Sequence, residues 1–157
     1  MRLYIIDHPF HFEAENLCRL FYPEEAVEKC TQDGPCTGCD VWTCAHEDGG
    51  QTVYTVRSGD VTRTDVGPAD EDRHEREYRM MALLFDVLCT VSGYHPRWGM
   101  LTGVRPAKLM NRLAEQDGTD AARTAFINKY RVDPDKAELA ARVAAREREI
   151  ISACGPR

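Results

Sequence analysis

The hydrophobic residues of the first seventy positions fall into short runs rich in β-branched and aromatic types. Four such runs predict strands, at residues 3–7, 41–45, 52–57 and 61–66. The last three are separated by Gly49-Gly50 and by Ser58-Gly59-Asp60, which can supply the positive φ angles of tight turns. We therefore expect an antiparallel meander, and such small hairpins need a covering layer to be stable.

Beyond residue 70 the hydrophobic spacing changes to that of helices. Residues 78–91 carry two apolar stripes at helical spacing, which predicts a central core helix that ends before Gly93. Its charged beginning, residues 70–77, is expected to face solvent. Further helices are predicted at residues 13–21, 106–116, 121–130 and 134–151. Pro134 suits the first position of the last one.

Together these elements predict the α+β class. We expect a small antiparallel β-sheet, or meander, packed on the central helix and followed by a C-terminal helical segment. Residues 1–96 would form the α+β subdomain, with a cysteine-containing insertion at 24–46, and residues 97–157 the helical segment. The part of the insertion from 24 to 38 is polar and contains Gly and Pro, so we expect it to be irregular.

Composition limits the possible partners and locations. The chain has 157 residues, of which 43% are hydrophobic and 29% charged, and it shows neither a membrane-spanning run nor an export signal. A cytoplasmic location is expected. Residues 1–96 carry a net charge of −10 and residues 97–157 one of +4. Since there is no dense basic block, we do not expect nucleic acid as a partner.

Seven cysteines in a chain without an export signal favour free thiols or metal ligation over disulfides. Four of them are clustered: Cys30, Cys36, Cys39 and Cys44. They could close a tetrahedral zinc or iron–sulfur site, since Cys36-x-x-Cys39 has the usual knuckle spacing and His46 could replace one ligand. Only one such knuckle is present, and Cys44 falls in a predicted strand. Both interpretations, metal site and ordinary thiols, stay open.

The most distinctive run extends from Trp98 to Leu109 and reads WGMLTGVRPAKL. It resembles the tryptophan-glycine, leucine-threonine-glycine and arginine-proline signature in the N-terminal region of HemZ-type proteins. These are coproporphyrinogen dehydrogenases, the oxygen-independent coproporphyrinogen III oxidase-like branch of the radical-SAM superfamily. The apolar helix before the run and the helix at 134–151 fit the same pattern, so the resemblance covers residues 75–151.

The resemblance implies a parent enzyme of haem (porphyrin) biosynthesis. That enzyme converts propionate groups of coproporphyrinogen III to vinyl groups by oxidative decarboxylation, using S-adenosylmethionine and a [4Fe-4S] cluster. The family's cluster motif, CxxxCxxC, is absent here, because Cys30, Cys36 and Cys39 have the spacing CxxxxxCxxC. We therefore expect no catalytic residue and no bound cofactor in this chain. It would be a non-catalytic accessory domain that packs on the radical-SAM barrel of the same polypeptide, with a homo-oligomer as a further option.

Three residues of the distinctive run are candidates for anion binding or domain docking: Trp98, Arg105 and Lys108. Pro106 begins a predicted helix whose free N–H groups attract anions, and Arg105 and Lys108 add positive charge. A carboxylate or phosphate could bind there. Alternatively, the two cations pair with acidic side chains of the barrel or of this chain's own acidic half, and Trp98 is a hydrophobic anchor, which is the interpretation we favour.

The competing hypothesis is an independent interaction module for protein or RNA, with the cysteine cluster as its zinc or iron–sulfur site. RNA binding on a sheet requires exposed aromatic rings, and only Trp42 and Tyr54 are candidates among the predicted strands of the meander. A self-sufficient enzyme lacks support, since no paired carboxylates, nucleophile–base set or phosphate loop can be recognised.

Overall fold

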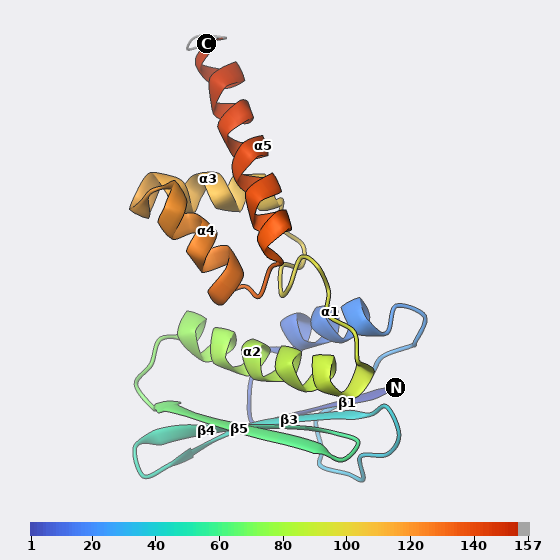
Figure 1. Ribbon diagram of the computed structural model, residues 1–157. Helices are drawn as coiled ribbons and strands as arrows, with labels where there is room; N and C mark the ends of the chain where they lie inside the picture. The colour runs from blue at the N-terminus through green and yellow to red at the C-terminus, as the bar shows by residue number, and fades with distance from the viewer. Residues whose placement is uncertain (154–157) are drawn as a thin grey trace. The chain divides into compact units, whose positions relative to one another are not determined.

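The computed structural model describes residues 1–153 (Figure 1). The chain divides into two compact units, one formed by Met1–His95 and one that begins at Pro96. Each unit has its own hydrophobic core. No helix in the described part of the chain is both long and apolar enough to cross a bilayer.

The first unit is a five-stranded sheet with two helices. Its elements are β1 (Arg2–Ile6), α1 (His11–Phe21), β2 (Glu28–Cys30), β3 (Val41–Asp48), β4 (Gln51–Ser58), β5 (Val61–Pro68) and α2 (Arg73–Ser92). The strand order is β2-β1-β3-β4-β5, and β1 runs parallel to both of its neighbours. The α+β prediction is confirmed. The antiparallel description holds for β3, β4 and β5 only, so the sheet as a whole is mixed.

One strand contradicts the sequence-based expectation of an irregular segment between residues 24 and 38. β2 is a three-residue edge strand paired with β1, and two of its residues are exposed. Its sequence, Glu-Lys-Cys, carries no hydrophobic alternation, so nothing local marks it as a strand. It is held by partners distant in sequence, including the ion pair between Lys29 Nζ and Glu15 Oε2 at 2.6 Å.

The two faces of the sheet have different environments. Figure 1 shows α1 and α2 on the same side of the sheet. Side chains alternate along each strand, so Tyr54 and Val56 of β4 point toward the helices and are fully buried. On the opposite, helix-free face lie Trp42 of β3 and Arg57 of β4, which are directly paired across the two strands.

The predicted core helix, α2, is confirmed and has well-formed ends. The Asp72 side chain accepts hydrogen bonds from the backbone N–H of His74 and Glu75, and Gly93 ends the helix in the left-handed conformation. On its buried side, Met80, Leu84 and Leu88 are fully enclosed. Such burial against the sheet supplies the cover that the hairpins require.

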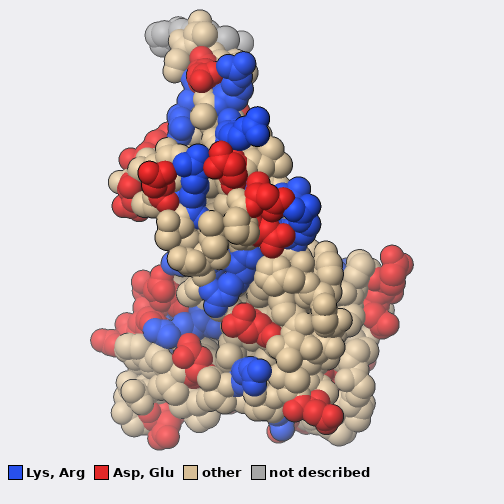
Figure 2. Space-filling model, in the orientation of Figure 1, with Lys and Arg blue, Asp and Glu red and all other residues tan. Residues whose placement is uncertain are grey.

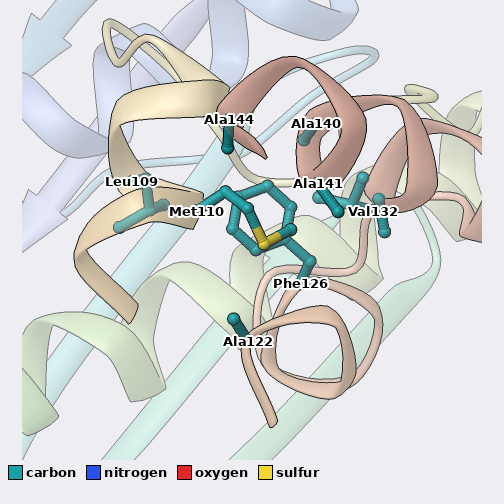
Figure 3. Packing of buried hydrophobic residues seen from close by; sticks show 9 residues of the cluster. Leu109, Met110, Ala122, Phe126, Val132, Ala140, Ala141 and Ala144 are labelled. Atoms are coloured by element: carbon teal, nitrogen blue, oxygen red, sulfur yellow. The ribbon is translucent and has the colours of Figure 1, made fainter. Parts of the chain in front are cut away.

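The second unit contains three helices, α3 (Pro106–Asp117), α4 (Thr119–Asn128) and α5 (Pro134–Ala153). Its core is built around Phe126 and Met110, which lie side by side in Figure 3. The residues that α5 contributes are all alanines: Ala137, Ala140, Ala141 and Ala144. Small side chains let helices approach closely, so α5 packs on α3 and α4 without presenting large apolar groups to them.

Candidate functional site

The first half of the distinctive run is part of the framework of the second unit. Trp98 is partly buried against the core, and Lys136 Nζ lies 5.6 Å from the centre of its ring. Gly99 has a φ of +56°, and a Cβ atom there would lie 2.1 Å from the carbonyl oxygen of Tyr130. The next residue, Met100, donates its N–H to that same oxygen at 2.8 Å. The Trp98-Gly99 pair thus fixes the loop against the connection between α4 and α5.

The second half of the run is exposed. Pro106 is at the start of α3, as expected, and Arg105 occupies the N-cap position without a capping side-chain hydrogen bond. Arg105 and Lys108 are exposed, and Val104 beside them keeps 51% of its surface. Within residues 1–153 no carboxylate forms an ion pair with either cation. The loop therefore presents one apolar and two positively charged side chains to the outside.

Three exposed apolar residues lie on the side of α5 that faces away from its alanines. We call Leu139, Val143 and Ile150 the α5 stripe. They follow one another at intervals of four and seven residues and therefore share one face of the helix. Their exposed fractions are 42%, 42% and 60%. Figure 2 shows Lys and Arg side chains, in blue, interspersed with Asp and Glu side chains, in red, over the second unit.

Two of the four clustered cysteines lie on strands, and the other two lie in the loop between β2 and β3. Cys30 ends β2 opposite Tyr4, and Cys44 lies on β3 opposite Ile6, so both side chains point to that face. In that loop Cys36 is partly buried and Cys39 is exposed. The structure thus brings Cys30 and Cys44 to one face of the sheet.

Asp40 organises the cysteine loop, and its role could not be recognised in the sequence. Its carboxylate accepts hydrogen bonds from the Arg2 N–H at 2.7 Å and from the Thr37 N–H at 3.2 Å. Its carbonyl oxygen accepts from the Cys36 thiol at 3.2 Å. Burial opposes ionisation of Asp40, but the hydrogen bonds and the Arg2 guanidinium outweigh it and hold the pKa of the carboxyl below its usual value.

The chemistry of the thiols bears on the predicted zinc or iron–sulfur site. Burial raises the pKa of both Cys36 and Cys44, which favours the protonated thiol over the thiolate that metals bind. Among the described residues, no three His, Cys, Asp or Glu side chains are grouped so as to hold a metal ion. A metal site formed by Cys30, Cys36, Cys39 and Cys44 stays a prediction.

The two aromatic residues considered for base stacking have different positions. Tyr54 is fully buried on the helix-bearing face, so the expectation that it could offer its ring was wrong. Trp42 is on the helix-free face, but its indole N–H donates to Asp33 Oδ1 at 2.8 Å. The Arg57 guanidinium covers the ring at 4.2 Å. Trp42 therefore connects the loop to the sheet.

His8 is a buried polar residue near the carboxyl end of β1. The Thr43 hydroxyl donates to the Tyr4 carbonyl at 2.7 Å, so it accepts from His8 Nε2 at 2.9 Å. His8 Nδ1 accepts the N–H of Phe10 at 3.3 Å. This network assigns the neutral Nε2–H tautomer. Burial, together with the nearby His11, lowers the pKa of His8 to about 4.

Comparison of the chain with protein-family models, with curated proteins and with solved structures finds no match.

Proposed function

We propose that this chain is a non-catalytic accessory domain of a radical-SAM protein of the coproporphyrinogen dehydrogenase type. In this proposal it packs on the catalytic barrel of the same polypeptide and helps to shape it. The support from sequence is the run from Trp98 to Leu109, and the chemistry of haem biosynthesis belongs to the parent protein. The barrel, with its [4Fe-4S] cluster and S-adenosylmethionine, would supply that chemistry.

The observation that carries the docking part of the proposal is the exposed surface of the second unit. The α5 stripe and Val104 are apolar groups open to solvent, and Arg105 and Lys108 lie close to Val104 in the chain. Exposed apolar side chains with charged side chains nearby are typical of a surface that another protein covers. Trp98 has a structural role here, because its side chain packs against the core of the second unit and thereby holds the loop in place.

Hydrogen–deuterium exchange tests the docking. The amides of α5 are expected to exchange more slowly in the full-length parent protein than in the isolated chain, because the barrel covers the stripe only in the former. Replacing Val143 and Ile150 by Ser in the parent should restore much of the fast exchange. Arg142→Ser, a change on the same helix but outside the stripe, is the matched control.

Two results would contradict the proposal. The first is identical exchange of α5 in the isolated chain and in the parent. The second is turnover of any porphyrinogen by the isolated chain, which would show that it carries catalytic groups of its own.

A further inference from the structure

The outer edge of β5 is open along most of the strand. β5 is last in the sheet order, and no strand within residues 1–153 pairs with its other side. Thr62 and Thr64 are exposed, and Val66 keeps 44% of its surface. An exposed edge strand presents unpaired N–H and C=O groups, which are a template for pairing with a further strand.

The hairpin between β4 and β5 determines which backbone groups point outward. Its turn consists of residues 59–60, and Ser58 pairs with Val61 across it. In a two-residue hairpin this closing pair exchanges both backbone hydrogen bonds, and bonded and non-bonded pairs alternate from there. The alternation leaves three exposed residues whose N–H and C=O groups point away from β4: Thr62, Thr64 and Val66.

The sequence around Thr64 is complementary to itself in the reverse direction. When Thr64 faces Thr64 of a second, antiparallel copy, Thr62 faces Val66 and Arg63 faces Asp65. Every outward-pointing residue then meets an outward-pointing partner, so three bonded pairs can each exchange two hydrogen bonds. A shift of one residue would lose these bonds. A shift of two would place Arg63 opposite Arg63, or Asp65 opposite Asp65.

Two charged side chains at this edge, Arg63 and Asp65, are accessible to a second copy. Arg63 is exposed, and it forms no ion pair with any carboxylate in the described part of the chain. Asp65 is bound by Arg79 Nη1 at 3.1 Å, but its side chain keeps 44% of its surface. Opposite charges directly across two antiparallel strands stabilise the pairing, and like charges weaken it.

We propose that a second copy of this chain binds the β5 edge as an antiparallel strand, related by a two-fold axis at Thr64. The sheet of the first unit then continues from one copy into the other. The contact is small compared with stable dimer interfaces, so the association is weak and reversible. This inference concerns the first unit and does not depend on the proposed function, which concerns docking by the second.

Sedimentation velocity over a range of protein concentrations tests the proposal. The chain should show a monomer–dimer equilibrium that shifts toward the monomer on dilution. Thr64→Pro should abolish the dimer, because it removes an outward N–H while leaving the bonds to β4 in place. Arg63→Glu should weaken association by about tenfold or more, since two attractive contacts become repulsive.

Arg73→Glu is the matched control, because it changes the charge equally at an exposed position outside β5, and it should leave association unchanged. Amide exchange measured by NMR locates the contact. Protection of Thr62, Thr64 and Val66 should rise with protein concentration, whereas Arg63 and Asp65 should be protected throughout.

A chain that stays monomeric up to about 1 mM, or a dimer that survives both Thr64→Pro and Arg63→Glu, overturns the proposal. Protection of the edge amides that appears only when a different protein is added would assign the edge to that protein instead.

Discussion

At the residue scale, two glycines of the run from Trp98 to Leu109 have positive φ angles but different surroundings. Gly99 follows Trp98 in the motif, and only the structure shows that the peptide of Tyr130 occupies the space where a side chain would lie. Its neighbour in the motif, Gly103, also has a positive φ, yet no atom lies within 4 Å of the position of its Cβ. A sequence cannot separate these two cases, because the approaching backbone comes from a residue far along the chain.

The contrast between the two glycines gives a testable difference in stability. Gly99→Ala should reduce the free energy of unfolding by about 2–4 kcal/mol, because it adds a clash with backbone to an unfavourable φ. Gly103→Ala should cost only about 1 kcal/mol, since only the φ is unfavourable. Chemical denaturation followed by circular dichroism measures both. Equal losses in the two variants would show that the loop is not held against Tyr130.

His8 gives a prediction for the acid range. Its pKa is about 4 in the folded chain, against an ordinary value of 6.5, so the unfolded chain binds the extra proton more readily. The contribution of neutral His8 to stability is therefore complete above pH 6.5, and it is lost as the pH falls toward 4. The loss amounts to about 3 kcal/mol.

NMR titration of the His8 ring protons checks this value directly, with an expected midpoint near pH 4. His8→Gln keeps a donor for Thr43 but does not titrate, so its stability should depend less on pH between 6.5 and 4. A midpoint near 6.5 in the native chain would show that His8 is not buried in this hydrogen-bond network.

At the scale of elements, periodicity predicted most helices and strands because their apolar faces are buried within the same unit. α2 is the clearest case, since its stripes coincide with Met80, Leu84 and Leu88 in the core. β2 and the parallel pairing of β1 were not predicted. Both depend on contacts between distant segments, and the three residues of β2 carry no pattern of their own.

The ion pairs at the charged beginning of α2 also depend on contacts between distant segments. This stretch was expected to face solvent, but two of its arginines form ion pairs with residues outside the helix. Arg79 binds Glu71 Oε2 at 2.8 Å and Asp65 of β5 at 3.1 Å, and Arg76 lies 4.0 Å from Glu47 of β3. Helical spacing therefore predicted a charged face correctly, but the partners depend on how the sheet packs against the helix.

At the scale of the whole molecule, the second unit is where the proposed function is concentrated. Its core is filled by residues of the unit itself, among them Phe126, Met110 and the alanines of α5. The α5 stripe lies outside this core and is exposed to solvent. The candidate site was thus predictable as a motif and a charge pattern. Its division into an inner, structural half at Trp98-Gly99 and an outer, exposed half at Val104 to Lys108 was not, because burial depends on the packing of three helices.

The central claim is that these residues accompany a radical-SAM barrel in one polypeptide. The most direct measurement is the coding sequence downstream of the Arg157 codon in the natural gene. The account predicts a strand followed by the cluster motif CxxxCxxC within a few tens of codons. A stop codon at that place, or a following domain without that motif, would contradict it.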